Sequence, residues 1–538
     1  MAVPERAAAR KATRLPVSGN AWDSISIPEI GAWEPTATVS VVIPYYQAPD
    51  QLEITLAALQ NQSYPSHLLE VVVADDGSDP PLELPPRSGG PPVRVIHQER
   101  DGFGLARARN LGAESADGEI LVFLDCDMVP ERRHIEAHAR WHHEIEYALV
   151  FGLRRHVDFD DIEPSMVAEA VRSDRLADLF AGRPVQAVQW VAQHLERSDW
   201  LKADMADPWR VTSGGNLSIR RDFFWEVGGY DQSFRQWGGE DNEFGFRAYN
   251  QGAVVVPEPG ARAWHQGEGH EPTDQESFSL EEQRPKLANL IPDPSMRRSR
   301  IGRTYTVPMM TIEVLATEGT KEQTLSAVES ILAGRFGDLV VFVELSGQDP
   351  HLEWMRRQFA GDGRVRVGTD LDPMREIPGA PLRMELPNSI LVSVGTLESV
   401  VDLMWRENLG AVHITNPDWD NALKLIEVYR TRAWERASRF EEDPALRNAM
   451  IGKLFTERWI SGISCGCFAT DSYGTPRAET SWLSELEARD AHIRVLQSRR
   501  SLRIADAVGS VLSARSWRQL AEATQSVWRA LFRNPSQA

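Results

Sequence analysis

The sequence predicts an α/β protein built on a mostly parallel sheet. Two apolar runs of strand length, residues 38–46 and 70–74, flank a segment of helical periodicity at residues 51–62. Strand, helix and strand in that order make a parallel βαβ unit. A third run, Ile120–Leu124, is apolar throughout, as expected for a strand that is buried on both faces. The carboxyl ends of such strands form the ligand crevice of open α/β sheets, so we expect functional residues directly after them.

The third run ends in Asp125-Cys126-Asp127. Two carboxylates this close repel each other unless a cation lies between them. Hard divalent ions take oxygen ligands and commonly share their coordination shell with substrate phosphates. The motif therefore indicates a site for a metal and a diphosphate. A strand that simply ends in a polar turn explains the motif equally well when it is taken alone.

Two further segments are predicted to face the same crevice. Residues 75–78 read Asp-Asp-Gly-Ser and would place Asp76 where its carboxylate accepts hydrogen bonds from a base or ribose, although the same residues are ordinary turn formers. Residues 101–112 contain Arg107 and Arg109, whose guanidinium groups can bind phosphate or base edges. The alternative for this second segment is a helix start with solvated arginines.

Residues 38–275 contain motifs that resemble those of family 2 glycosyltransferases with the GT-A fold, in that family's order and spacing. The nucleotide-binding half of the family is similar to TVSVVIPYY, VVVADDGSD and GLARARNLGAESADGEILVFLDCDMVP. The acceptor half is similar to VTSGGNLSIRRDFF and VGGYDQSFRQWGGEDNEFGFRAYNQG. The WGGEDNEFGFR block and the AWHQGEGHEP loop resemble those of galactosyltransferase-type domains and bacterial chondroitin-type polysaccharide synthases. The resemblance implies a GT-A catalytic domain, with a Rossmann-like, mostly parallel sheet, at residues 36–275.

The resemblance also implies roles for single residues. The nucleotide is expected to contact Pro44, Tyr46, Asp76, Arg107 and Asp125. The donor and acceptor sugars are expected at Gly214, Gly215, Asn216 and Trp237. The metal, Mn2+ or Mg2+, is expected on Asp127, Asp125 and His265, with His270 as an alternative ligand. Catalysis is expected from Asp241 as general base, with Glu240 as its acidic neighbour.

The chemistry of sugar transfer requires groups of these kinds. A divalent cation stabilises a leaving diphosphate as a Lewis acid, and a positioned carboxylate deprotonates a sugar hydroxyl. Trp237 can stack on the apolar face of a sugar ring. The alternative for this block is a Gly-Gly turn that begins a helix, with Glu240 and Asp241 in its first turn. For His265 the alternative is a structural histidine without a metal.

These observations predict a metal-dependent, inverting glycosyltransferase (a hexosyl- or N-acetylhexosaminyltransferase). It would move a sugar from a nucleoside diphosphate, with UDP favoured, to a hydroxyl of a carbohydrate or lipid-linked carbohydrate in polysaccharide or glycoconjugate synthesis. Two alternatives come from other classes. A non-catalytic sugar- or nucleotide-binding protein would not need both acidic pairs, and a nucleotidyltransferase has no use for the WGGED block.

The rest of the chain predicts further domains, because its 538 residues suffice for about two to four domains of ~150 residues each. Residues 1–35 read as a flexible N-terminal arm and residues 276–302 as a linker or closing loop. Residues 303–475 are expected to form a second, degenerate GT-A-like α/β domain without the acidic motifs. Its strands are expected at residues 306–315, 339–345 and 389–394, and its helices at residues 321–332, 397–407 and 421–438.

Residues 476–538 have helical periodicity and are rich in arginine. A basic amphipathic helix can lie on an anionic membrane surface, pack on a neighbouring domain or self-associate, so peripheral membrane contact stays open. No apolar run approaches the ~18 residues that span a bilayer, and the N-terminus lacks the apolar core of a secretory signal. These features predict a cytoplasmic protein, with the inner face of the plasma membrane as a peripheral site.

Composition excludes several classes of protein. A net charge of −20 argues against nucleic acid as a partner. The three cysteines provide neither a disulfide framework nor a four-cysteine zinc site.

Overall fold

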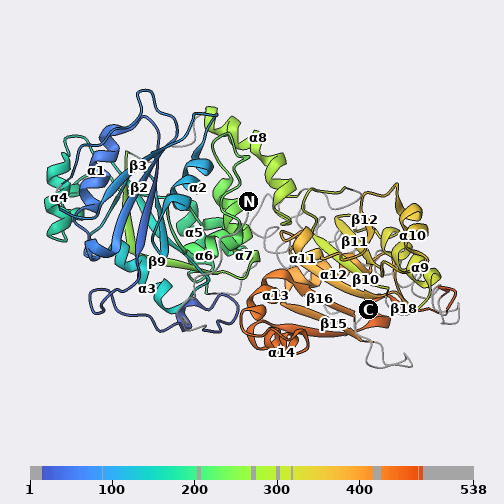
Figure 1. Ribbon diagram of the computed structural model, residues 1–538. Helices are drawn as coiled ribbons and strands as arrows, with labels where there is room; N and C mark the ends of the chain where they lie inside the picture. Colours follow the sequence, from blue (N-terminus) through green and yellow to red (C-terminus); the bar gives the residue numbers. More distant parts are fainter. Residues whose placement is uncertain are drawn as a thin grey trace, which may run out of the picture. The chain divides into compact units, whose positions relative to one another are not determined.

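The computed structural model describes residues 15–87, 89–202, 207–267, 274–297, 303–316, 319–415, 426–470 and 472–475. In these residues the chain forms a nine-stranded sheet and a seven-stranded sheet, with helices packed against them (Figure 1). The predicted α/β class is confirmed. None of the helices in this part of the chain is long and apolar enough to cross a membrane.

The first sheet contains the strands that were expected to carry the site. Its strand order is β3-β2-β1-β4-β8-β6-β9-β5, with β7 paired to β6. Strands β1 to β4 run parallel, and β8 is antiparallel to both β4 and β6. The strands are β1 (Val39–Tyr45), β2 (Leu69–Asp75), β3 (Val93–His97), β4 (Ile120–Leu124), β5 (Met128–Pro130), β6 (Ala148–Val157), β7 (Gln186–Ala187), β8 (Asn216–Arg220) and β9 (Val254–Gln266).

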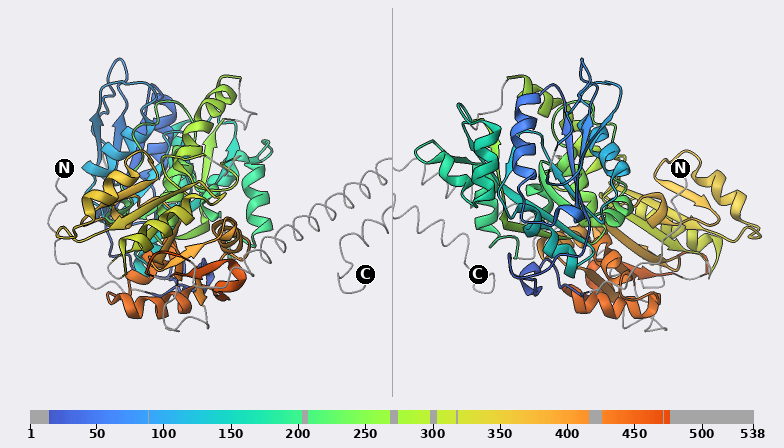
Figure 2. Two further views of the ribbon diagram at one scale, coloured as in Figure 1. Left: turned by 90° about the vertical axis from the view of Figure 1, so that its right-hand side faces the viewer. Right: turned by 60° about the vertical axis from the view of Figure 1, so that its left-hand side comes forward.

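Helices cover both faces of this sheet (Figures 1 and 2). Alternate residues of β4 enter different cores: Val122 packs with α1, and Phe123 packs with α6 and α7. Such double burial explains why β4 is apolar at every position. The α-helices are α1 (Pro49–Leu59), α2 (Leu105–Ser115), α3 (His134–Glu144), α4 (Pro164–Arg172), α5 (Gln189–Arg197), α6 (Arg221–Val227), α7 (Glu240–Asn250) and α8 (Asp274–Leu290), and the 3-10 turns are Trp22–Ser24, Ser66–Leu68, Leu176–Phe180 and Pro208–Val211.

The second sheet repeats the topology of the first. Its order is β12-β11-β10-β13-β16-β15-β17, and each of its neighbouring pairs runs in the same parallel or antiparallel sense as the corresponding pair along β3-β2-β1-β4-β8-β6-β9. The prediction of a second α/β unit is thus confirmed. Its strands are β10 (Met310–Leu315), β11 (Leu339–Glu344), β12 (Val365–Gly368), β13 (Leu382–Pro387), β15 (Ala411–Thr415), β16 (Ile426–Arg430) and β17 (Glu457–Ser461), with β14 (Ile390–Val392) paired to β18 (Cys467–Ala469) outside this sheet.

The second unit lacks the acidic motif of the first. Strand β13 corresponds to β4, but it is followed by Asn388 and Ser389 where β4 is followed by two aspartates. Both sheets belong to one compact part of the chain, which ends at Gly474. The helices of the second unit are α9 (Lys321–Leu332), α10 (Leu352–Phe359), α11 (Pro373–Glu376), α12 (Thr396–Arg406), α13 (Thr431–Ser438), α14 (Pro444–Leu454) and α15 (Gly462–Cys465).

Two of the predicted segments outside the N-terminus contain a different type of secondary structure. Residues 426–430, predicted as part of a helix, form strand β16, because β13 and β15 hydrogen-bond to it on both sides. Part of the predicted linker or closing loop, residues 276–290, lies in helix α8, whose Leu287 packs into the first core.

The N-terminal segment also differs from its prediction. Asn20 is buried, and its side-chain amide donates to the carbonyls of Leu201 and Val255 and accepts from the N–H of Val255. Val17 is buried as well. The flexible-arm prediction is therefore wrong for residues 15–35. Residues 1–14 and the predicted helical tail, residues 476–538, lie outside the described residues.

Candidate active site

The end of strand β4 turns so that Asp127 reaches strand β9. The N–H of Met128 donates to the carbonyl of Asp125 at 3.0 Å, which closes a tight turn, and β5 then pairs antiparallel with β9. This pairing sets Asp127 beside His265, with 3.2 Å between Oδ2 of the aspartate and Nε2 of the histidine. The histidine is therefore brought to the motif by strand register, across more than 130 residues of sequence.

The second acidic pair lies in the first turn of α7. Gly239 precedes the helix with a φ of +93°, a conformation that favours glycine over every other residue. Glu240 and Asp241 follow it directly, and their negative charge is stabilised near the positive end of the helix dipole. The Gly-Gly turn and the acidic pair are thus one local structure, as both interpretations of this block required.

Arg109 of α2 joins the two acidic pairs. Its guanidinium nitrogens lie 3.0 Å from Oδ1 of Asp125, 2.7 Å from Oδ1 of Asp241 and 3.4 Å from Oε1 of Glu240. Its side chain is 1% exposed and packs 5.1 Å from the ring centre of Tyr230. The carboxylates at the end of β4 and at the start of α7 therefore face one site.

The loop before β8 has glycines at the positions that lie against Arg109 and the acidic side chains. Any Cβ atom at Gly214 would overlap the carboxylate of Asp241 and the guanidinium of Arg109, and any Cβ at Gly215 would overlap the carboxylate of Asp125. Both glycines thus lie directly against the acidic groups, where the sequence placed the sugar-binding loop.

The carboxyl groups of the site differ in the direction in which the protein shifts their pKa. Burial raises the pKa of Glu240 to about 7, and the nearby charge of Asp241 adds to this effect. Burial also raises the pKa of Asp125, although Arg109 opposes it. Burial would likewise raise the pKa of Asp127, but the hydrogen bond and charge of His265 outweigh it and the pKa is lowered. Arg109 keeps its proton: burial would lower its pKa, yet Asp241 and Asp125 raise the pKa well above its ordinary value.

The residues at the end of β4 fit a divalent cation that shares its shell with substrate. Oδ1 of Asp127 and Nδ1 of His265 are buried and have no hydrogen-bond partner among the described residues. In the described ranges no three His, Cys, Asp or Glu side chains gather closely enough to hold a metal by themselves. Two protein ligands suit Mg2+ or Mn2+, which commonly complete their shells with water and substrate phosphates.

The predicted nucleotide residues lie at the ends of β1 and β2. Tyr46 is 41% exposed, and the guanidinium of Arg100 lies 3.7 Å from its ring centre. Asp76 is almost fully buried: it accepts from the N–H of Gly104 at 2.8 Å and from Gln98 at 2.6 Å, and it pairs with Arg100. Arg100 thus contacts two of the predicted nucleotide-binding residues, Tyr46 and Asp76.

Pro44 forms part of β1, within the predicted run of residues 38–46. The pairing of β1 with β4 stops at Val42, and beyond this point only β2 is hydrogen-bonded to β1. A proline here costs no ladder hydrogen bond on the unpaired side. Pro44 is buried beside the exposed Tyr46.

Three other residues predicted for the site differ from one another in their exposure and contacts. Trp237 is 41% exposed at the surface, as a sugar platform requires. Asn216 is turned inward: its amide donates to the carbonyl of Ala261 and its oxygen lies 2.9 Å from Nε2 of His138, so a direct sugar contact by this side chain is not supported. Arg107 pairs with Asp101 at 3.6 Å and has no contact with the acidic groups. His270 lies outside the described residues.

The sequence prediction chose Arg107 over Arg109 and overlooked Arg100. Residues two apart on a helix point about 200° apart, so only one of the two arginines can face the end of the sheet. The packing of α2 against β1 and β2 decides which one it is, and that packing is not visible in the residue pattern. The only feature of the sequence that pointed to Arg100 as a site residue was its position shortly after strand β3.

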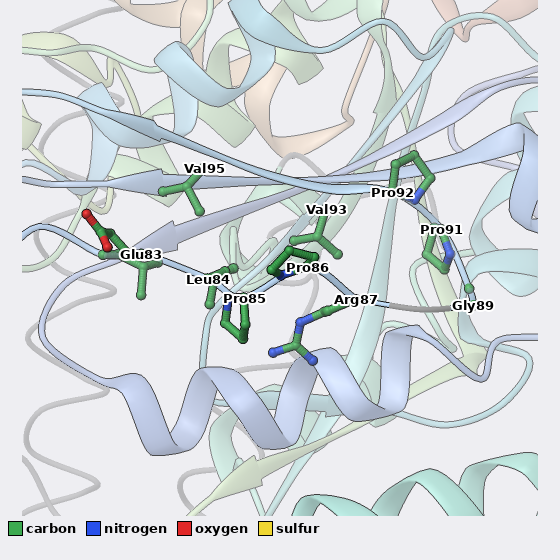
Figure 3. Close-up of a pocket in the computed structure, with 12 residues that line it drawn as sticks. Glu83, Leu84, Pro85, Pro86, Arg87, Gly89, Pro91, Pro92, Val93 and Val95 are labelled. Carbon is green, nitrogen blue, oxygen red and sulfur yellow. The ribbon is translucent and has the colours of Figure 1, made fainter.

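A large surface pocket lies away from this site. It has a volume of about 760 Å³ and is lined by the proline-rich loop between β2 and β3, including Pro85, Pro86, Pro91 and Pro92 (Figure 3). None of its lining residues belongs to the acidic cluster. Arg87 in its wall pairs with Glu53 of α1.

Part of the chain is similar to two known families. Residues 40–228 match the family described as glycosyl transferase family 2, and residues 200–261 match the family described as the N-terminal domain of galactosyltransferase. Residues 40–261 are thus similar to glycosyltransferase domains, as the motifs predicted.

Individual relatives are similar over part of their length. The chain is 29% identical over 344 residues to chondroitin synthase of Escherichia coli, covering 61% of this chain and 49% of that protein. It is 28% identical over 352 residues to hyaluronan synthase of Pasteurella multocida, covering 61% and 35%. The match thus spans half or less of these relatives. Among solved structures, the crystal structure of GalNAc-T7 with UDP, GalNAc and Mn2+ is 18% identical, with a TM-score of 0.32 over 47% of this chain and 48% of that chain.

The raised pKa of Glu240 predicts a pH-dependent stability difference. In the unfolded chain this carboxyl ionises near 4.5, whereas in the folded protein it holds its proton until about pH 7. The folded state is therefore penalised as the pH rises from 4.5 to 7, and the penalty persists above pH 7. Glu240→Gln should remove it, stabilising the ligand-free protein at pH 8 relative to pH 4.5 by at most roughly 3 kcal/mol. Thermal unfolding of both proteins across this range would show it; an equal difference at both pH values would contradict the assignment.

Proposed function

We propose that this protein catalyses metal-dependent, inverting transfer of a sugar from a nucleoside diphosphate donor, with UDP favoured, to a carbohydrate hydroxyl. The main support is the contact of one buried guanidinium, that of Arg109, with Asp125 and Asp241. Asp125, which is expected beside the diphosphate, and Asp241, the proposed base, therefore contact the same side chain. The names of the similar synthases favour a role in polysaccharide synthesis.

Asp241 is the better candidate for the general base of the two acids in α7. Its side chain is 25% exposed and can reach an acceptor, whereas that of Glu240 is 7% exposed. Arg109 holds one oxygen of Asp241, which fixes the orientation of the carboxylate. Asp241 would take the proton of the acceptor hydroxyl as that oxygen attacks the anomeric carbon and the bond to the diphosphate breaks.

The remaining residues position the donor. Asp127 and His265 would hold the cation, and when bound it supplies Lewis-acid stabilisation of the leaving diphosphate. Tyr46 and Asp76 would bind the nucleotide, with Arg100 moving from the tyrosine ring to admit the base. Gly214 and Gly215 would allow the donor sugar to approach the backbone between the two acidic groups.

The proposal is tested by release of UDP from nucleotide-sugar donors in the presence and absence of Mn2+. We expect UDP release that chelation abolishes, and a product anomer of inverted configuration by NMR. Asp127→Asn and His265→Ala should each raise the Mn2+ concentration that gives half-maximal activity by about 10–100-fold.

The same assay separates the alternative functions. A sugar- or nucleotide-binding protein would bind the donor without releasing UDP, and a nucleotidyltransferase would release pyrophosphate from a nucleoside triphosphate. His143→Ala is a matched control for His265→Ala, because His143 is a half-exposed histidine near Glu144 and away from the acidic cluster. Metal-independent UDP release would overturn the proposed role of Asp127 and His265.

A further inference from the structure

Two of the three cysteines lie side by side in the second unit. Cys465 is the last residue of α15, and Cys467 is the first residue of β18, which Figure 1 labels. Their sulfur atoms are 3.5 Å apart. Both residues are free cysteines, so this distance is a contact between two thiols. A disulfide bond would join the same atoms at about 2.0 Å, and the thiols need only a small approach to form one.

Gly466 turns the chain so that the two thiols meet. It has a φ of +83°, in the left-handed region that favours glycine. Any Cβ atom at this position would overlap the hydroxyl oxygen of Ser393, so a larger residue does not fit. The N–H of Ser393 donates to the carbonyl of Gly466 at 2.7 Å, and the hydroxyl of Thr396 donates to the carbonyl of Cys465 at 2.6 Å. These contacts hold the backbone of the Cys-Gly-Cys turn in place.

The two thiols differ in exposure and in acidity. Cys465 is partly buried, whereas Cys467 is fully buried in the second core. A hydrogen bond from the Cys467 thiol lowers the pKa of Cys465. The same hydrogen bond, together with burial, raises the pKa of Cys467 well above its ordinary value. Since the thiolate is the nucleophile of thiol–disulfide exchange, Cys465 is the thiol that reacts first.

Two sulfur atoms alone do not form a structural zinc site, which takes four protein ligands. In the described ranges no third His, Cys, Asp or Glu side chain completes a metal-binding group around the two thiols. The remaining cysteine has the opposite acidity: burial and the charges of Asp127 and Asp125 raise the pKa of Cys126. The chemistry open to Cys465 and Cys467 is therefore that of a dithiol.

We propose that Cys465 and Cys467 form a redox-active dithiol, which a low-molecular-weight disulfide such as oxidised glutathione converts reversibly to an intramolecular disulfide. The Cys465 thiolate attacks one sulfur of the reagent, forms a mixed disulfide and releases one glutathione thiolate. The Cys467 thiol then loses its proton to solvent and attacks the sulfur of Cys465, and the second glutathione thiolate leaves. The two cysteines are thereby oxidised, and the glutathione disulfide is reduced to two thiols.

The proposal is tested by mass spectrometry of the full-length protein after treatment with oxidised glutathione. The tryptic peptide of residues 459–477 contains both cysteines. It should lose two hydrogen atoms, and dithiothreitol should restore both thiols. Cys126 is the matched control in the same sample, because it is partly buried like Cys465. Cys465 should react about tenfold faster than Cys126.

Two serine variants separate the steps of the reaction. Cys467→Ser should accumulate the mixed disulfide of glutathione with Cys465, because the thiol that resolves it is missing. Cys465→Ser should leave Cys467 unmodified, because that thiol is buried. Phenylarsine oxide gives a second test on the wild-type protein, without any substitution. Its arsenic binds two adjacent thiols with loss of water, so it should protect both cysteines from iodoacetamide.

Three results would overturn the proposal. They are separate mixed disulfides on the two cysteines without a bond between them, oxidation of Cys126 as fast as that of Cys465, and no protection of the pair by phenylarsine oxide. The reaction involves neither the nucleotide nor the acidic cluster. Its outcome is therefore independent of the proposed sugar transfer.

Discussion

Asp241→Asn is expected to retain UDP binding and lose turnover. The amide keeps the size of the side chain and its contact with Arg109, but it cannot accept the proton of the acceptor hydroxyl. A positioned general base contributes about 10²–10⁴-fold to a rate, so kcat should fall by a factor in this range. Steady-state transfer assays and UDP titration of the same preparation would separate the two effects.

Glu240→Gln is the matched control for this loss. Glu240 is the adjacent acid in the same turn, it is buried, and it contacts the same guanidinium at 3.4 Å. Its substitution should reduce kcat much less than that of Asp241. Full turnover by Asp241→Asn would remove Asp241 from the role of base, and a greater loss in Glu240→Gln would assign that role to Glu240.

Arg109→Met is expected to cause the largest loss of stability. The substitution keeps an unbranched side chain of similar length but removes the charge that neutralises Asp125 and Asp241. Removing the buried partner of this ionic cluster should cost at most about 3–5 kcal/mol, because the partly buried Asp125 and Asp241 lose the charge that neutralises them. Urea-induced unfolding monitored by circular dichroism would measure the change.

Arg107→Met provides the comparison on the same helix. Arg107 is partly exposed and pairs with a carboxylate that is 66% exposed, so its loss should cost less than about 1 kcal/mol. Arg109→Lys should fall between the two, because an ammonium cannot bind two carboxylates with the geometry of a guanidinium. Equal stability of the two methionine variants would show that Arg109 does not hold the acidic groups together.

The sequence predicted those parts of the site whose residues are adjacent in the chain. Strand β4 is apolar at every position and its functional residues follow it without a gap, so Asp125 and Asp127 could be placed from the residues alone. The acidic turn of α7 was equally visible, because Gly239 and the two acids are adjacent. The pairing of His265 with Asp127 depends on the register of β5 and β9, and it came from family resemblance instead.

The remaining features depend on tertiary contacts that the residue pattern does not contain. Residues 426–430 were predicted as helix because they adjoin a true helical segment, and two neighbouring strands decided otherwise. Asn216 was expected at the sugar, but its amide is held in the interior by His138 and Ala261.

The convergence of the two acidic pairs is tested most directly by a crystal structure with UDP and Mn2+. Anomalous scattering should locate the manganese against Asp127 and His265, with the diphosphate beside Asp125 and the carboxylate of Asp241 facing the position of the donor's anomeric carbon. A manganese ion bound elsewhere, or a diphosphate whose donor end points away from Asp241, would contradict a single active site formed by these residues.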